Sequence, residues 1–241
     1  MPSYIDQTGR TVILNSLPKK IISTVPSQTE LLCHLNLEEQ LAGITHFCIH
    51  PEGIQKRKQN IGGTKNLDLA LIRNINPDLI IANKEENRKD QIEELTNEFP
   101  VWVSDINNLE DTYEMIKSVG GMTGRKKEAN KLTSEIIALF SKYSPEKAFQ
   151  KIKAAYFIWK KPFMAVGGNT FINSIMEKAG IQNIFAACKR YPETNLETLL
   201  RNDCQLLMLS SEPYHFTQKD IEELIPLLPG VKIVLVDGEM F

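Results

Sequence analysis

The chain has 241 residues, of which 42% are hydrophobic and 24% are charged, and its formal net charge is −2 at pH 7. These values are ordinary for a globular protein of one large domain or two small ones, and they exclude the strongly basic balance that a nucleic-acid partner requires. No apolar run approaches the roughly 20 residues that span a bilayer, so the chain is not expected to cross a membrane.

The first half of the chain alternates short apolar segments with helical ones. Strands are predicted at 11–14, 21–24, 42–45, 79–82 and 101–103, and helices at 27–35, 67–74, 88–97 and 109–118. Ser27 and Glu30 have the spacing of a capping box, which predicts that Ser27 caps the first helix. Strand–helix alternation of this kind predicts an α/β lobe with a mostly parallel sheet.

A long helix is predicted in the middle of the chain, after Gly120, Gly121 and Gly124 interrupt the earlier pattern. Apolar residues then recur at helical spacing, at Ala129, Leu132, Ile136, Leu139 and Phe140. Residues 124–142 are therefore expected to form one amphipathic helix about 28 Å long, at 1.5 Å per residue. We expect Pro145 to end it and the helix to act as a rigid connector.

Helices and strands alternate again in the second half of the chain. Strands are predicted at 154–159, 162–166, 205–209 and 232–236, and helices at 170–179, 196–202 and 218–228. This half therefore has the pattern of a second α/β lobe.

One phrase of sequence occurs twice, about half a chain apart. With two one-residue gaps, residues 66–82 and 195–210 both read Asn-Leu-acid, then a Leu-rich helix, then Arg-Asn, then an apolar strand. A period this long is not that of a solenoid, whose repeats have about 20–50 residues. It predicts an α/β fold of two similar lobes, at 1–118 and 147–241, joined by a rigid backbone helix at 119–146. We expect a ligand cleft between the lobes.

Ligands of open parallel sheets bind beyond the carboxyl ends of the strands. The candidate residues there are Ser27, His46, Phe47, Asn83, Trp159 and Glu212, with Arg190 and Tyr191 on a further loop. This mixture of aromatic, polar and charged side chains suits a large, partly polar organic ligand better than a bare ion.

Several of these residues also have an ordinary structural explanation. Ser27 could serve only as a helix cap, and His46 could be an ordinary loop histidine. Trp159 could lie in the core. Tyr191 could pack on the surface, although a phenolate would also suit ferric iron in a haem or siderophore complex.

Asp68 and Glu197 occupy matching positions in the two copies of the repeat. If Asn66 and Asn195 cap the helices that follow, both acids lie in a first helical turn, where the helix dipole stabilises negative charge by about 0.3–1 kcal/mol. Alternatively, one acid per lobe could meet arginines on a two-fold symmetric partner. We favour this second interpretation because both copies keep the whole Asn-Leu-acid phrase.

Several short motifs follow one another along the chain. They lie at 6–10, 18–23, 26–32, 61–68, 76–82 and 167–171 and read DQTGR, PKKIIS, PSQTELL, IGGTKNLD, NPDLIIA and GGNTF. Their order and spacing resemble those of the helical-backbone class of periplasmic binding proteins, which serve ABC importers of cobalamin, haem and ferric siderophores. Within that class the chain looks most similar to the cobalamin-binding branch.

The resemblance implies a solute-binding component of an ABC importer and not an enzyme. The implied ligand is a cobalamin-like corrinoid or a related metal chelate, bound without an intrinsic cofactor or protein metal site in a cleft that Gly63 and Thr64 also line. Asp68 and Glu197 would dock the loaded protein on the permease dimer. The resemblance also implies a monomer that is periplasmic or exported, although the first residues given do not have the pattern expected of a secretory signal. The C-terminal lobe is expected to be shorter than in relatives, which continue with a closing helix.

Three other interpretations stay open. The first keeps the class but changes the ligand to haem or a ferric siderophore. The second is a cytoplasmic α/β enzyme, although the chain has no Walker, G-x-G-x-x-G, G-x-S-x-G or H-E-x-x-H motif. The third is a binding protein for bare zinc or manganese, which would need three or four converging ligands in a chain with four histidines.

Overall fold

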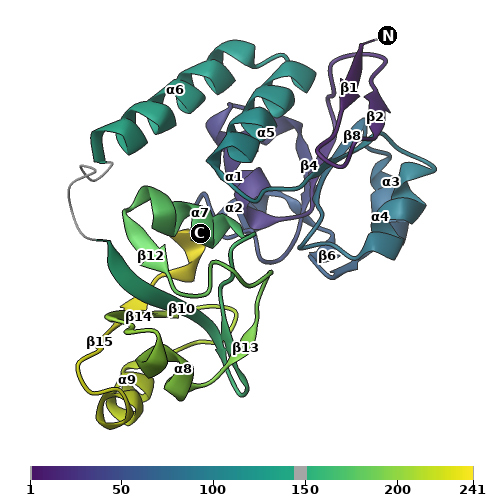
Figure 1. Cartoon of the computed structure of the whole chain (residues 1–241). Coiled ribbons are helices and arrows are strands. Elements are labelled where there is room, and N and C mark those ends of the chain that lie inside the picture. Colours follow the sequence, from purple (N-terminus) through teal and green to yellow (C-terminus); the bar gives the residue numbers. More distant parts are fainter. Residues whose placement is uncertain (1, 144–150, 241) are drawn as a thin grey trace. The chain divides into compact units, whose positions relative to one another are not determined.

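The structure is a computed structural model that describes residues 2–143 and 151–240 (Figure 1). The chain forms two compact units: the N-terminal unit comprises Met1–Ile106 and Glu110–Ile136, and the C-terminal unit comprises Asn107–Leu109 and Ile137–Phe241. The domain boundaries expected from the sequence stay a prediction. Residues 144–146 of the expected linker, including Pro145, lie outside the described residues.

A five-stranded parallel sheet forms the centre of the N-terminal unit. Its strands are β3 (Ile21–Ser23), β4 (Leu41–Ile44), β5 (Gln59–Asn60), β8 (Leu79–Asn83) and β9 (Val101–Ser104), in the spatial order β5-β4-β3-β8-β9. Two hairpins accompany it, β1 (Ser3–Ile5) with β2 (Thr11–Ile13) and β6 (Gly62–Gly63) with β7 (Asn66–Leu67). The helices are α1 (Pro26–His34), η1 (Glu38–Gln40), α2 (Ile54–Arg57), α3 (Leu69–Ile75), α4 (Lys89–Thr96), α5 (Leu109–Met122) and α6 (Lys126–Tyr143).

Both faces of this sheet are buried, as is usual for parallel sheets. Successive side chains of a strand point to opposite faces. Ile21 therefore packs with Trp102 and with residues of α1 and α5, whereas Ile22 packs in a second cluster with residues of α3 and α4. Because both faces are apolar, the strands appear in the sequence as short continuous apolar runs.

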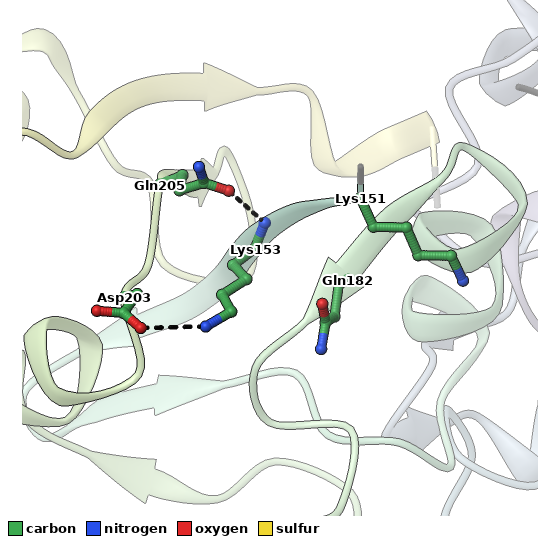
Figure 2. A pocket seen from close by; sticks show the side chains of 5 residues that line it. All are labelled: Lys151, Lys153, Gln182, Asp203 and Gln205. Carbon is green, nitrogen blue, oxygen red and sulfur yellow. Dashed lines mark hydrogen bonds and ion pairs between the residues drawn. The ribbon is translucent and has the colours of Figure 1, made fainter. Parts of the chain in front are cut away.

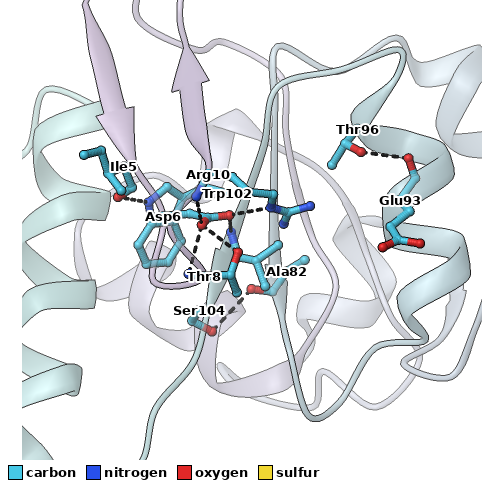
Figure 3. A network of polar contacts seen from close by, with 10 residues as sticks. Ile5, Asp6, Thr8, Arg10, Ala82, Glu93, Thr96, Trp102 and Ser104 are labelled. Carbon is cyan, nitrogen blue, oxygen red and sulfur yellow. Dashed lines mark hydrogen bonds and ion pairs between the residues drawn. The ribbon is translucent and has the colours of Figure 1, made fainter.

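A buried carboxylate fixes the β1–β2 hairpin to the sheet. Asp6 is 3% exposed, and one of its oxygens accepts hydrogen bonds from the Thr8 hydroxyl (2.7 Å) and the Arg10 backbone N–H (2.9 Å). The other oxygen accepts from Arg10 Nε (3.0 Å) and from the Val103 N–H (3.3 Å) of β9. Figure 3 shows the contacts with Thr8 and Arg10. The motif at 6–10 therefore has a structural role, since these donors satisfy a charge that burial would otherwise destabilise.

The α1 helix starts two residues earlier than an N-cap at Ser27 predicts. It begins at Pro26 and its N-cap is Val25, which makes no side-chain cap hydrogen bond. Proline suits the first helical position because its fixed φ is helical and its missing N–H would have no intrahelical partner there. The prediction that Ser27 caps this helix was wrong.

The helices α5 and α6 pack closely at Gly120. Because α5 continues through Gly120 and Gly121, the expectation that these glycines interrupt the helical pattern was wrong. A Cβ on Gly120 would lie 2.4 Å from the Cβ of Ala129 in α6, so a larger residue does not fit. Gly124 has a φ of +73° in the turn between the helices. The long helix expected at 124–142 is confirmed as α6.

The C-terminal unit has a mixed six-stranded sheet. Its strands are β10 (Ile152–Lys160), β11 (Phe163–Ala165), β12 (Ile181–Asn183), β13 (Glu193–Thr194), β14 (Leu206–Ser210) and β15 (Lys232–Val236). Its helices are α7 (Phe171–Lys178), α8 (Leu196–Arg201), α9 (Gln218–Leu224), η2 (Ile225–Leu227) and η3 (Gly238–Met240). The strands β12, β10, β14 and β15 pair in parallel, and β11 and β13 add antiparallel pairing beside the end of β10. The helix expected at 218–228 is divided between α9 and η2.

The predicted similarity of the two units is confirmed by their topology. The parallel strands lie in the order β4-β3-β8-β9 in the N-terminal unit and β12-β10-β14-β15 in the C-terminal unit. In each case the strand that comes first in the chain lies between the second and the third. The two copies of the repeated phrase take equivalent places, because α3 leads into β8 and α8 leads into β14. Each unit is therefore an α/β unit with a parallel core.

A charged network fixes the end of β10 to α9. Lys160 Nζ lies 2.5 Å from Asp220 Oδ1 and 2.6 Å from Glu223 Oε2, and the side chains of Lys160 and Asp220 are 14% and 8% exposed. Burial alone would raise the pKa of Asp220, but hydrogen bonds from Lys160 and Thr217 outweigh it and hold that pKa below its usual range. The hydrogen bonds to Asp220 and Glu223 raise the pKa of Lys160. The ammonium therefore stays charged beside Asp220.

Candidate functional site

The predicted ligand residues of the N-terminal unit lie on loops around the carboxyl edge of its sheet, which we call the N-terminal rim. They are Ser27 near the start of α1, His46 and Phe47 after β4, Gly63 and Thr64 in the β6–β7 hairpin, and Asn83 at the end of β8. Parallel sheets bind ligands at this edge.

An exposed aromatic pair lies on this rim. The rings of His46 and Phe47 have centroids 4.1 Å apart, and Phe47 is 53% exposed. Gly63 lies directly against them, because a Cβ there would be 2.9 Å from His46 Cε1 and 3.4 Å from Phe47 Cε2. The His46 N–H also donates to the carbonyl of Gly62 (3.0 Å). The structure therefore brings His46, Phe47 and Gly63 together, with the two rings exposed and Gly63 buried beneath them.

Thr64 and Asn83 are bonded to the protein itself. Thr64 is 7% exposed, and its carbonyl accepts a hydrogen bond from Asn87 Nδ2 (2.9 Å). The side-chain amide of Asn83 donates to the Ser104 hydroxyl (3.0 Å), and its oxygen accepts from the N–H of Glu85 (2.9 Å). These two residues therefore shape the loops of the rim. Ser27 is exposed and lies three residues beyond Thr24, which also bonds to Asn87.

The predicted residues of the C-terminal unit fall into two groups, of which the first is aromatic. Trp159 lies near the end of β10 and is 39% exposed, so the alternative that it lies in the core was wrong. Its ring meets that of Tyr214 edge-on, with centroids 5.8 Å apart, and Tyr214 lies 4.7 Å from the ring of Phe216. Glu212 is exposed in the same loop, which follows β14. Aromatic stacking of this kind orients the Trp159 ring.

The second group lies on the loop between β12 and β13. Arg190 has a φ of +57°, and its carbonyl accepts a hydrogen bond from the Gly167 N–H (2.7 Å). Its guanidinium carbon lies 5.7 Å from the centre of the Tyr191 ring, which packs partly buried against an apolar cluster of the unit. A Cβ on Gly167 would lie 2.6 Å from the Cys188 carbonyl oxygen, which explains the glycine in this motif.

A buried phenol lies behind the carboxyl edge of the C-terminal sheet. The hydroxyl of Tyr156 donates to the hydroxyl of Ser210 (3.1 Å). Burial raises the pKa of Tyr156, and the charges of Glu212 and Asp237 raise it further, while the Ser210 hydrogen bond lowers it. Tyr156 is therefore a neutral hydrogen-bond donor at neutral pH.

The two predicted docking acids are exposed but differ in their local contacts. Asn66 belongs to β7, and Asp68 itself caps α3, because its side chain accepts a hydrogen bond from the Leu71 N–H (2.9 Å). The expectation that Asn66 caps this helix was wrong. Asn195 caps α8 as predicted, and Glu197 lies in the first turn of that helix.

A hollow of about 460 Å³ lies at the amino edge of the C-terminal sheet (Figure 2). It is lined by Lys151, Lys153, Gln182, Asp203 and Gln205. Lys153 Nζ pairs with Asp203 (3.2 Å), and the Lys153 N–H donates to Gln205 Oε1 (3.0 Å). The lining is polar and contains none of the predicted ligand residues, so it suits a mostly apolar ligand poorly.

Two global features bear on the class of protein. Across residues 2–143 and 151–240, no helix combines the length and apolar character that crossing a membrane requires. Within the same described ranges, no three His, Cys, Asp or Glu side chains gather where they could hold a metal ion.

The sequence did not predict two residues near these surfaces, Tyr214 in the C-terminal unit and Asn87 in the N-terminal unit. Tyr214 had a weak signal, since it is an aromatic residue two positions after Glu212 in a strand-end loop. Asn87 had none, because its partners include Thr24, which is 63 positions earlier in the chain.

Comparison with known sequences gives the chain its relatives. A family described as periplasmic binding protein matches residues 21–226, which is most of the chain. The vitamin B12-binding protein of Pectobacterium atrosepticum is 23% identical over 204 residues, covering 80% of this chain and 72% of that protein.

Solved structures share the fold. A possible iron-binding (periplasmic solute-binding) protein of Staphylococcus epidermidis has a TM-score of 0.79 at 25% identity, covering 93% of this chain and 92% of that one. The periplasmic heme-binding protein HutB of Vibrio cholerae has a TM-score of 0.78 at 17% identity, covering 91% and 90%. The chain therefore belongs to the periplasmic binding protein family, a family of substrate-binding proteins and not of enzymes, and it is the solute-binding component of an ABC importer.

Proposed function

We propose that this chain captures a cobalamin-like corrinoid, or a closely related metal chelate, at surfaces on the carboxyl edges of its two sheets. The observation that carries the proposal is an exposed aromatic surface at the carboxyl edge of each sheet. In the N-terminal unit this surface is the His46–Phe47 pair, and in the C-terminal unit it is Trp159. A corrinoid is a large and mostly apolar ring with polar amide arms, which suits aromatic surfaces with a few polar groups near them.

The polar groups near these surfaces support an amide-bearing ligand. Glu212 and Arg190 offer an acceptor and a set of donors in the C-terminal unit, and Ser27 offers a hydroxyl on the N-terminal rim. The vitamin B12-binding relative aligns with most of the chain. Together these points favour a corrinoid over a compact ion.

A titration that compares two ligands tests this proposal. Purified protein is titrated with cyanocobalamin and, separately, with haemin, and the visible absorbance is followed. We expect saturable one-to-one binding of cyanocobalamin with a Kd in the micromolar range or below, which corresponds to about 8 kcal/mol or more. Absence of cyanocobalamin binding, with saturable haemin binding and a shifted Soret band, would contradict the corrinoid assignment.

The haem alternative has specific candidate iron ligands. His46 is exposed on the N-terminal rim, and Tyr191 is half-buried on the other unit; imidazole and phenolate both ligate haem iron. If haemin binds, His46→Ala and Tyr191→Phe decide whether either residue coordinates the iron, because loss of a ligand shifts the Soret band. If the corrinoid assignment is right, Tyr191→Phe should leave cyanocobalamin affinity within about twofold, whereas His46→Ala should weaken it because it removes one ring of the aromatic pair.

We infer that delivery uses one acid from each unit. Asp68 and Glu197 are exposed and occupy matching sequence positions in the two copies of the repeated phrase. A permease dimer with paired arginine pockets would bind such acids, and their exposure leaves them accessible to a partner. This docking role is independent of the ligand, so it can be tested separately.

We further infer that the protein acts outside the cytoplasm, which the description of its family as periplasmic binding protein supports, and that it does so as a monomer. Cell fractionation of the native host and sedimentation of the ligand-free protein test both points. Recovery with cytoplasmic markers, or a stable dimer, would contradict them.

A further inference from the structure

One buried asparagine joins the loops of the N-terminal rim. Asn87 lies between β8 and α4 and is 6% exposed. Its Oδ1 accepts hydrogen bonds from the Thr24 hydroxyl (2.7 Å) and the Asn83 N–H (2.8 Å). Its Nδ2 donates to the carbonyls of Thr64 (2.9 Å) and Thr24 (3.4 Å). A side-chain amide can accept two hydrogen bonds and donate two, so this one uses its full capacity.

The partners of Asn87 come from three different segments of the rim. Thr24 connects β3 to α1, the helix that carries Ser27. Asn83 ends β8, and Thr64 lies in the β6–β7 hairpin. One side chain therefore links segments that are far apart in the sequence.

The hairpin extends this link to the aromatic pair. The Gly62 carbonyl accepts a hydrogen bond from the His46 N–H (3.0 Å), and Gly63 packs directly against the rings of His46 and Phe47. A displacement of the hairpin would therefore displace the aromatic surface.

We propose that Asn87 is a positioning residue, which holds the loops of the N-terminal rim in the arrangement that binds ligand. This proposal rests on the proposed function of the N-terminal rim as a ligand site. Asn87 would act on the ligand indirectly, through Thr24, Thr64 and Asn83. Loops are otherwise free to sample other arrangements, and ordering them on binding weakens the observed affinity. If a variant kept the competent arrangement in about one molecule in ten, its Kd would rise about tenfold.

Two variants and one control test this role. Asn87→Leu removes the whole set of hydrogen bonds and keeps the branched shape of the side chain. Thr24→Val removes one hydroxyl, which donates to Asn87 Oδ1 and to the Ile81 carbonyl (3.1 Å). The control is Ile92→Ala, because Ile92 is also 6% exposed and lies in the adjacent α4, but packs in the apolar core. Each variant is measured for thermal stability, for amide hydrogen exchange without ligand and for affinity toward cyanocobalamin.

We expect a local effect in the positioning variants. In Asn87→Leu, the amides of residues 62–67 and 83–88 should exchange about tenfold faster or more, while those of β3 and β8 before Asn83 keep their protection. The exchange rate of the Asn83 N–H reports directly on the loss of the Asn87 side chain, because this N–H donates to Asn87 Oδ1. The Kd should rise about tenfold, and Thr24→Val should show a smaller change in the same direction. The control should lower thermal stability but change neither the loop exchange nor the Kd.

Several results would overturn the proposal. Unchanged loop exchange in Asn87→Leu would do so, as would a wild-type Kd despite faster exchange or the same pattern in the control. If Asn87→Leu does not fold, Thr24→Val decides alone, since it removes one hydroxyl at nearly constant volume. If the wild-type protein does not bind cyanocobalamin, the proposed function fails, and the exchange measurement still decides whether Asn87 holds the loops.

Discussion

The two proposed docking acids, Asp68 and Glu197, differ in their local contacts, so they need different substitutions. Asp68 carries a charge and also caps α3, whereas Glu197 pairs with Arg201 across one helical turn (3.2 Å) on a fully solvated surface. Arginine at position 68 would remove the cap as well as the charge. Asparagine caps helices about as well as aspartate, so Asp68→Asn changes the charge with little effect on stability.

We predict that the double variant Asp68→Asn with Glu197→Gln binds ligand normally but is not transported. Its Kd for cyanocobalamin should stay within about twofold of wild type, and permease-dependent uptake should fall about tenfold or more, because charged pairs at an interface set both encounter and register. The control exchanges two other exposed acids, Asp90→Asn with Glu193→Gln, and should be transported normally. Normal uptake by the first variant, or lost ligand binding, would contradict the docking role.

Individual site residues differ in how far the sequence predicts them. His46, Phe47 and Trp159 could be placed because parallel strands bring their carboxyl ends to one edge of a sheet. Asn87 and Tyr214 could not, because their roles depend on three-dimensional contacts with Thr24 and Trp159 that no local pattern records.

At the scale of helices, the contact between α5 and α6 gives a pair of opposite predictions. A Cβ on Gly120 would lie 2.4 Å from Ala129 Cβ, whereas a Cβ on Gly121 would have its nearest neighbour at 3.7 Å. Gly120→Ala should therefore destabilise the protein by about 1–3 kcal/mol through overpacking. Gly121→Ala should stabilise it by about 0.5–1 kcal/mol, because alanine favours the helix. Urea unfolding measures both, and equal effects of the two substitutions would refute the close packing.

The connection between β10 and α9 makes stability depend on pH. The pKa values of Asp220 and Glu223 are lowered, so the stability they contribute is present above their unfolded pKa values, near pH 4, and is lost as pH falls through the folded ones. Lys160→Met should cost about 3 kcal/mol at pH 7, because it leaves Asp220 buried without its cation. It should also flatten the fall in stability between about pH 5 and pH 3.

Thermal unfolding across this pH range tests the connection, with Lys161→Met as the control at the neighbouring exposed lysine. The control should keep the stability and pH dependence of the wild type. A Lys160→Met variant that unfolds like the control at every pH would show that the network contributes nothing.

The elements that the sequence predicts best are those whose patterns are local. The strand at 232–236 coincides with β15, because its run of β-branched and apolar residues is short, continuous and bounded by turn residues. The helix cap at Asn195 was also correct, since capping depends on neighbouring residues. The two-residue strands β6 and β7 were missed because they exist only through pairing with each other, and α1 was misplaced because Pro26 can start a helix without a side-chain cap.

At the scale of the whole molecule, two units of the same topology each present an exposed aromatic surface at the carboxyl edge of a parallel sheet. This duplication is the physical basis of the proposed function, since each unit supplies its own aromatic surface for ligand contact. Each unit is then expected to contribute separately to affinity. Phe47 and Trp159 are 53% and 39% exposed, so truncating either should affect binding more than folding.

A calorimetric titration of cyanocobalamin into wild type, Phe47→Ala and Trp159→Ala tests this account most directly. The control is Leu227→Ala, an equally accessible apolar residue (56% exposed) in η2, which precedes the amino end of β15. We predict one binding site per molecule and a Kd about tenfold higher in Phe47→Ala and in Trp159→Ala, which is a loss of about 1.4 kcal/mol each. The Kd of the control should be unchanged. A wild-type Kd in Phe47→Ala or Trp159→Ala, or no binding by the wild-type protein, would contradict this account.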